Sequence, residues 1–199
     1  MGRDKALLPI GGRTFLEHLA SVLDGEVAPL IVVLGHHSEQ IEKQVHLPPG
    51  TWILRNPSYH LGQLSSLHVA LRSLAEQRVD AALVCLVDHP AVTKPVVKAL
   101  LSRFEQSRSA ILVPSWQGRR GHPVLFASGL FGELLAAPLD QGARVVIRRH
   151  AEQVEYLDVD EEGIVWDVDR PEDYAALQSR WTRSDGLSRA DSPPPAEQS

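Results

Sequence analysis

Apolar positions along the chain follow two spacings, one typical of amphipathic helices and one typical of buried strands. Residues 14–23 have apolar side chains at helical spacing, with Thr14 where a helix N-cap is expected. Residues 30–34 and 81–87 are short, unbroken apolar runs without alternation. Such runs are typical of strands that are covered on both faces.

The same criteria predict the remaining elements. Helices are expected over residues 38–45, 64–74, 96–104, 128–135 (with Ser128 as N-cap), 143–150 and 171–181. Strands are expected over residues 52–54, 110–113, 123–126, 154–157 and 164–166. Strands that alternate with helices favour an α/β fold with a mostly parallel sheet between helical layers. We therefore assign residues 1–182 to one domain, and residues 183–199, rich in Ser, Asp, Pro, Gln and Glu, to a disordered tail.

Composition narrows the class of protein. The chain has 199 residues, is 43% hydrophobic and carries a net charge of −5 without a long Lys or Arg run. This balance argues against a nucleic-acid or anionic-membrane surface. The apolar runs are too short to cross a bilayer, and the first residues do not match a signal peptide, so a cytoplasmic location is expected. The single cysteine, Cys85, lies in an apolar run and is expected to be a buried, inert thiol.

Asp88 is the first candidate for chemistry. It directly follows the 81–87 run, and ligands of α/β sheets bind beyond the carboxyl ends of the strands. A carboxylate held there suits Mg²⁺ that carries the phosphates of a nucleotide. The alternative is an Asp that only forms the turn before Pro90.

Asp167 and Asp169 form a second acidic pair. Their spacing of two in an extended segment places both carboxylates on one side, where they could share a metal with Asp88. The alternative is that they cap the helix that begins at Pro171.

Three further segments could bind a phosphorylated ligand. Gly2, Arg3 and Lys5 are typical of the back half of a phosphate-holding loop. Residues 118–123 place two arginines between glycines, which indicates either an anion-binding turn or a solvated hairpin. Residues 56–67 could hold a base, ribose or phosphate, although Ser65 could instead be an ordinary helix cap; the candidates there are Asn56, Gly62, Ser65 and Ser66. The nine histidines show no zinc-site spacing.

Together and in this order, these motifs resemble the MobA-like nucleotidyltransferases, and within them the molybdenum-cofactor cytidylyltransferase type. The resemblance covers residues 1–178. It rests on Gly2 to Pro9, on 56–67, on Asp88-His89-Pro90, on Gly-Arg-Arg-Gly-His-Pro-Val-Leu-Phe at 118–126, on 140–144, and on the acidic segment 167–173.

The resemblance implies a Rossmann-like three-layer α/β/α fold and a nucleotidyl transfer. A phosphate of the acceptor attacks the α-phosphorus of an NTP (CTP or GTP, with CTP favoured), and pyrophosphate leaves. The acceptor would be a phosphorylated molecule such as molybdopterin, and the product would serve a molybdoenzyme. Lys5 would hold triphosphate oxygens and Asp88, with Asp167 or Asp169, would bind Mg²⁺. Gly121 and His122 would shape the acceptor side.

Several positions depart from the family pattern. His89 stands where glutamine is usual and Tyr59 where tryptophan is common, which bears on the choice of base or acceptor. Arg170 replaces a capping threonine, so Asp169 is expected to cap the last helix and Asp167 to be the better metal ligand. Asp4 before Lys5 is similar to the guanylyltransferase branch, so a guanylyl- or sugar-phosphate nucleotidyltransferase is an alternative.

The resemblance also concerns the start of the chain. The family begins with a strand and a glycine-rich loop that would precede Met1, and we expect the assigned start to fall too late. The alternative from a different class is a non-catalytic domain that binds a nucleotide or a partner, because the phosphate loop is incomplete. A missing strand would leave the edges of its neighbours exposed.

Overall fold

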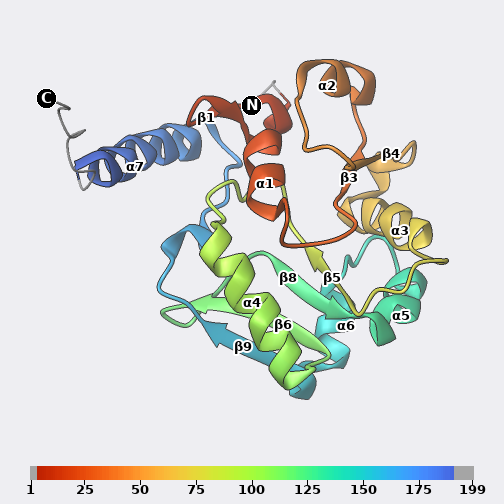
Figure 1. Cartoon of the computed structure of the whole chain (residues 1–199). Helices are drawn as coiled ribbons and strands as arrows, with labels where there is room; N and C mark the ends of the chain where they lie inside the picture. The colour runs from red at the N-terminus through yellow and green to blue at the C-terminus, as the bar shows by residue number, and fades with distance from the viewer. Residues whose placement is uncertain (1–3, 191–199) are drawn as a thin grey trace, which may run out of the picture.

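The computed structural model describes residues 4–190, with side chains described through Trp181, and places them around two main sheets, with a third sheet of two short strands near the start of the chain (Figure 1). The smaller sheet pairs β3 (Ile31–Leu34) with β4 (Trp52–Arg55) in parallel. The larger sheet has the order β5–β8–β6–β7, with β9 also paired to β6. Its strands are β5 (Ala81–Val84), β6 (Ile111–Trp116), β7 (Arg119–Arg120), β8 (Val124–Ala127) and β9 (Val154–Asp158).

Helices cover both sheets. The α-helices are α1 (Phe15–Leu23), α2 (Ser38–Gln44), α3 (Gln63–Ser73), α4 (Lys94–Ser107), α5 (Phe131–Ala136), α6 (Arg144–Arg149) and α7 (Pro171–Ala190). Thr14 caps α1 as expected, because its hydroxyl accepts from the Glu17 N–H (3.2 Å) while the Glu17 carboxylate accepts from the Thr14 N–H (2.8 Å). No helix among the described residues is long and apolar enough to span a membrane.

The sheet is more mixed than the sequence pattern predicts. β9 runs parallel to β6, whereas β8 is antiparallel to both β5 and β6. The reason is the tight turn between β6 and β7, which reverses the chain before it enters β8. The expected α/β class with a Rossmann-like fold is nevertheless confirmed.

Two strand predictions are wrong where the segment has no strand to pair with. The 81–87 run is a strand only to Val84, because the paired strand β8 begins opposite that residue, at Val124. Residues 164–166 were predicted as a strand, but residues Glu162–Val165 form a 3₁₀-helix, η5, with Gly163 and Ile164 buried.

Two helix predictions need smaller corrections. Ser128 makes no capping bond; it starts a 3₁₀-helix (Ser128–Leu130) that leads into α5. The last helix continues beyond Trp181 to Ala190, so residues 183–190 of the expected tail are helical, while residues 191–199 lie outside the described part.

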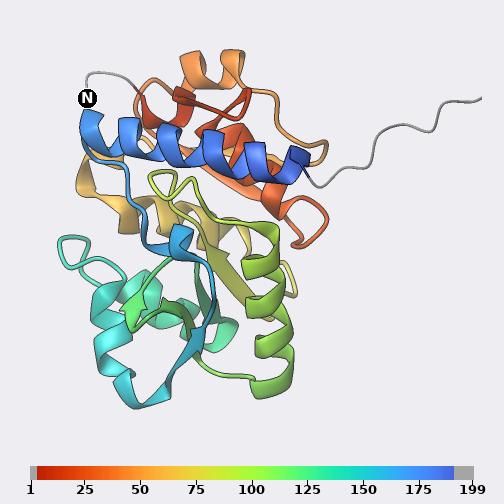
Figure 2. The ribbon, with the colours of Figure 1, turned by 90° about the vertical axis from the view of Figure 1, so that its left-hand side faces the viewer.

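The C-terminal helix packs on the N-terminal segment (Figure 2). The Tyr174 hydroxyl donates to the Pro9 carbonyl (2.8 Å), and the Trp181 ring meets His18 edge-on with centroids 4.9 Å apart. Short strands β1 (Pro9–Ile10) and β2 (Arg13–Thr14) pair at this contact. The first part of α7 therefore lies against the N-terminal segment, beside the edge of the sheets where β5 ends.

Candidate active site

Lys5 lies between two carboxylates from distant parts of the chain. Its Nζ is 2.5 Å from Asp169 Oδ1 and 3.7 Å from Asp88 Oδ2. Lys5 begins a 3₁₀-helix before β1, Asp88 follows β5, and Asp169 precedes α7. The Val168 N–H donates to the Asp88 carbonyl (2.9 Å), which anchors the acidic segment to the end of β5. The structure thus brings together three of the residues that the sequence singled out.

The carboxylate of Asp88 is only partly satisfied. Its Oδ2 faces Lys5, but its Oδ1 is buried without a hydrogen-bond partner. Buried oxygens without a donor are rare and call for a ligand, and a cation is the natural one for a carboxylate. The side chains at this site therefore fit a divalent metal, which Asp88 and Asp169 would hold.

No set of three or more His, Cys, Asp or Glu side chains among the described residues forms a complete metal cage. Mg²⁺ does not require one, since it is commonly bound through one or two carboxylates together with substrate phosphates and water. The site therefore suits a cation that arrives with a nucleotide.

Asp169 lies at the site in a way the sequence pattern did not predict. It was expected to cap α7, but the cap is Asp173, whose carboxylate accepts from the N–H groups of Asp169 (3.2 Å) and Arg170 (2.8 Å). The Asp169 carboxylate turns to Lys5 instead, and this hydrogen bond holds its pKa below the usual range. Asp167 makes no contact with Lys5, so Asp169 is the better placed of the two.

A second pocket adjoins this centre. It has a volume of about 470 Å³, and its lining includes His89, three arginines (Arg119, Arg120 and Arg180) and two carboxylates (Asp167 and Asp173). Arg180 also pairs with Glu162 (3.4 Å). Two guanidinium groups stack on rings, Arg120 on Tyr156 and Arg180 on Trp166, each 4.5 Å from the ring centre. The Trp166 Nε1 is buried without a partner. This lining fits an anionic ligand with a polar ring or amide.

The rings of His89 and His122 lie against each other at the junction of the two regions, with centroids 4.6 Å apart and planes tilted by 43°. Burial lowers the pKa of His89, and burial together with the neighbouring His89 lowers the pKa of His122 to about 4. Both rings are therefore neutral at pH 7, and each has a buried Nδ1 without a partner. Neutral imidazoles here can accept hydrogen bonds without repelling a cation beside Asp88.

Gly121 acts through its backbone. Its N–H donates to the Pro114 carbonyl (2.9 Å), and a Cβ on it would lie 2.4 Å from the Ile164 carbonyl oxygen. The His122 N–H donates to that same Ile164 oxygen (2.9 Å). Gly121 and His122 therefore hold β6 against η5, and their expected role toward an acceptor stays a prediction.

The polar side chains of the 56–67 loop form hydrogen bonds within the loop. Asn56, 2% exposed, donates to the hydroxyls of Ser65 (2.8 Å) and Ser66 (3.0 Å). The Ser65 hydroxyl donates to the Gly62 carbonyl (2.7 Å), so Ser65 does not cap α3. Gly62 has φ +95°, which explains glycine at that position. These bonds shape the loop, and nucleotide binding by it remains a prediction.

One cluster escaped the sequence analysis. His37 Nδ1 is 3.0 Å from an Asp4 carboxylate oxygen, and His36 Nδ1 is 3.0 Å from the Tyr59 hydroxyl. The two imidazoles are in contact, with planes tilted by 36°. The available signal was the position of both histidines directly after Gly35, at the carboxyl end of a strand. Gly2 and Arg3 lie outside the described residues.

Comparisons with known proteins agree on the fold and divide on the named activity. The probable molybdenum cofactor guanylyltransferase of Mycobacterium tuberculosis is 35% identical over 121 residues, 60% of this chain; the match spans 57% of that relative's length. The nicotine blue oxidoreductase of Paenarthrobacter nicotinovorans is 32% identical over 175 residues, 84% of each chain.

A solved structure with a bound metal is also similar. The Rv0371c protein of Mycobacterium tuberculosis, crystallised in complex with manganese, aligns with a TM-score of 0.76 and 26% identity over 89% of this chain and 94% of its own. The family model of the MobA-like NTP transferase domain matches residues 1–154, more than three quarters of the sequence. The chain therefore belongs to the MobA-like NTP transferase family.

Proposed function

We propose that this chain transfers a nucleoside monophosphate from GTP or CTP to a phosphorylated acceptor such as molybdopterin and releases pyrophosphate. The observation that carries the proposal is Lys5 held between Asp88 and Asp169 at the carboxyl end of β5. The expected preference for CTP has no support over GTP, because the named relatives include guanylyltransferases. The product would then be delivered to a molybdoenzyme.

Positioning and charge neutralisation account for the chemistry. An acceptor phosphate oxygen forms a bond to the α-phosphorus while the bond to the pyrophosphate oxygen breaks, so the protein forms no covalent intermediate. The Lys5 ammonium leaves Asp169 for the triphosphate oxygens, which frees the Asp169 carboxylate. A divalent cation, bound by Asp88 and Asp169 with the phosphates, would neutralise the charge that develops on the leaving group. Manganese in the related crystal structure supports such a cation, and Mg²⁺ is the one we propose for this chain.

The second pocket is the proposed acceptor side. Arg119, Arg120 and Arg180 offer planar, bidentate donors that suit a phosphate monoester. His89 lines this pocket and lies next to Asp88 in the chain, so an acceptor phosphate bound there is directed toward the metal site.

The test measures pyrophosphate release and metal binding on the same variants. Asp88→Asn keeps the side-chain shape but removes the charge, and should lower turnover by roughly 100-fold or more. It should also weaken Mn²⁺ binding measured by electron paramagnetic resonance, a readout that needs no turnover. Asp169→Asn is expected to have a larger effect than Asp167→Asn. Asp80→Asn is the matched control, because Asp80 is 83% exposed and pairs only loosely, 3.7 Å from Arg108.

Each outcome has a meaning. Unchanged turnover in Asp88→Asn would refute the metal role. Binding of GTP or CTP by the unmodified chain without pyrophosphate release would support the alternative of a non-catalytic nucleotide-binding domain. A change in the oxidation state of nicotine blue, followed by its absorbance in the absence of any NTP, would favour the activity named for the relative that matches over 84% of the chain.

A further inference from the structure

The two sheets face one another with unpaired edges. Among residues 4–190, β3 pairs only with β4, and β5 pairs only with β8. Each strand therefore presents one row of backbone N–H and C=O groups without a strand partner. Unpaired edges of this kind are templates for another strand.

The edges run in the same direction. β3 leads into His37, which contacts Asp4, and β5 leads into Asp88, which lies 3.7 Å from Lys5. Because Asp4 and Lys5 are neighbours in the chain, the carboxyl ends of β3 and β5 reach the same side of the molecule. A strand between them can be parallel to both.

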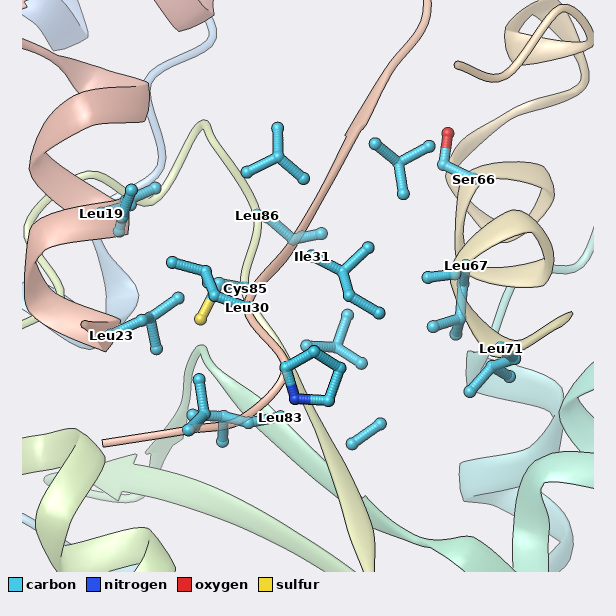
Figure 3. A pocket seen from close by; sticks show the side chains of 18 of the residues that line it. Leu19, Leu23, Leu30, Ile31, Ser66, Leu67, Leu71, Leu83, Cys85 and Leu86 are labelled. Carbon is cyan, nitrogen blue, oxygen red and sulfur yellow. The ribbon is translucent and has the colours of Figure 1, made fainter. Parts of the chain in front are cut away.

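An apolar cavity of about 420 Å³ separates β3 from β5 (Figure 3). Leu19 and Leu23 of α1 line one face, and Leu67 and Leu71 of α3 line the other. The cavity extends along both strands, from Val27 and Val79 at one end to Asp88 at the other. We call this cavity the slot.

The burial of the slot's own strands is unusual. All four residues of β5 are only partly buried, although they are apolar, whereas β6 and β8, elsewhere in the same sheet, are almost fully buried. Apolar side chains on both faces indicate an occupant that is itself apolar on both faces, as a central strand is.

We propose that the slot binds one extended, apolar peptide strand, parallel to β3 and β5, which joins the two sheets into one. A small hydrocarbon would fill the volume but leave both rows of backbone groups unpaired. A strand satisfies the apolar faces and both edges together, which is recognition by strand addition. The carboxyl end of such a strand comes out beside Asp88 and Lys5, next to the candidate active site.

The single cysteine of the chain gives a local readout. Cys85 lines the slot and is partly buried, and burial raises the pKa of its thiol to about 12. Its reaction with a disulfide reagent is therefore slow, and a strand in the slot should slow it further.

The probe is a peptide of about six Val, Ile and Leu residues ending in glycine, with lysines added at its N-terminus for solubility. It should bind the full chain one to one in calorimetry, slow Cys85 modification about tenfold, and protect backbone amides of β3 and β5 from hydrogen exchange. A peptide with proline at its centre lacks one backbone N–H donor and cannot pair as a continuous strand. It should change the rate of Cys85 modification by less than about twofold.

Variants of the chain provide a second test. Leu67→Glu places a charge in the slot and should abolish the protection by the peptide, whereas Leu61→Glu, at a residue 45% exposed outside the slot, should leave it intact. The unmodified chain with the two peptides keeps the test decisive even if Leu67→Glu does not fold.

Three results would overturn the proposal. Equal protection by both peptides would show unspecific apolar binding. No binding of either peptide would show that the slot is closed in solution. A dimer with Cys85 already protected would show that a second copy of the chain fills it. None of these measurements needs nucleotidyl transfer, so they are independent of the proposed function.

Discussion

Two regions of the molecule are packed in opposite ways. One is the contact of η5 with Gly121 and Ala91, which we call the closed junction, and the other is the slot between β3 and β5. At the closed junction, backbone meets backbone: a Cβ on Gly121 would lie 2.4 Å from the Ile164 oxygen, and one on Gly163 would lie 2.4 Å from the Ala91 oxygen. At the slot, a cavity of about 420 Å³ lies between the unpaired edges of two strands. Glycines permit the close approach at the junction, whereas the slot has room for the strand proposed above.

The candidate active site draws on both regions. Asp88 and the acidic segment are fixed by a backbone hydrogen bond from Val168, on the closed side. Lys5 comes from the segment before α1, on the side of the slot, and reaches Asp88 and Asp169 only through ion pairs. Exposed ion pairs position side chains less firmly than backbone bonds do. We therefore expect the acidic half of the site to be more rigid than the lysine half.

The largest effect is expected at the closed junction. Gly121→Ala should lower the free energy of unfolding by about 3 kcal/mol or more, because the added methyl group must displace the Ile164 carbonyl that accepts the His122 N–H. Urea unfolding followed by circular dichroism measures the difference. Gly129→Ala is the matched control, since a Cβ there has no atom within 4 Å and should change stability by less than about 0.5 kcal/mol. Equal effects of the two changes would contradict the close packing.

A second effect at this junction depends on pH. His122 has a folded-state pKa of about 4, against an ordinary value of 6.5, because it is buried and lies beside His89. The unfolded chain therefore binds more protons between pH 6.5 and 4, and stability falls as the pH drops through this window. The loss attributable to His122 reaches about 3 kcal/mol at the lower end.

The measurement is urea unfolding at several pH values on the unmodified chain and on His122→Gln. The variant has its own starting stability, so only the slopes of the unfolding free energy against pH are compared. At the centre of the window the slope should be smaller in the variant, by the amount that corresponds to about one bound proton. An identical slope in both proteins would show that His122 does not titrate on unfolding. His60→Gln serves as the control, because His60 is exposed and pairs with no carboxylate among the described residues.

Local signals in the sequence predicted local structure well. Thr14, the expected N-cap, gave the start of α1, and the apolar runs located β3 and β5. The end of β5 at Val84 could not be predicted, because it depends on where β8 begins. In the same way, residues 164–166 look like a strand, but no strand pairs with them among the described residues and Glu162–Val165 form a 3₁₀-helix.

The sequence predicted which residues lie close together better than it predicted the contacts that they make. Position after a strand identified Asp88, but the choice between Asp167 and Asp169 turned on a cap that Asp173 provides instead. The contact of His37 with Asp4 joins residues 33 positions apart, which no local pattern encodes. Likewise, the polar side chains of Asn56 and Ser65 suggested a ligand, whereas they bind one another.

The smallest effect is expected at the slot. Adding carbon atoms to a side chain should destabilise the closed junction but stabilise the protein at the slot. Ala70 of α3 lines the slot and is partly buried, so Ala70→Leu should place three more carbons into the cavity and raise the free energy of unfolding by about 1 kcal/mol. Ala75→Leu, at an exposed position just beyond α3, is the control and should change stability by less than about 0.5 kcal/mol. Because the leucine occupies the space of a bound strand, Ala70→Leu should also weaken the slowing of Cys85 modification by the apolar peptide. A loss of stability comparable to that of Gly121→Ala would instead show that the two regions are equally closed in solution.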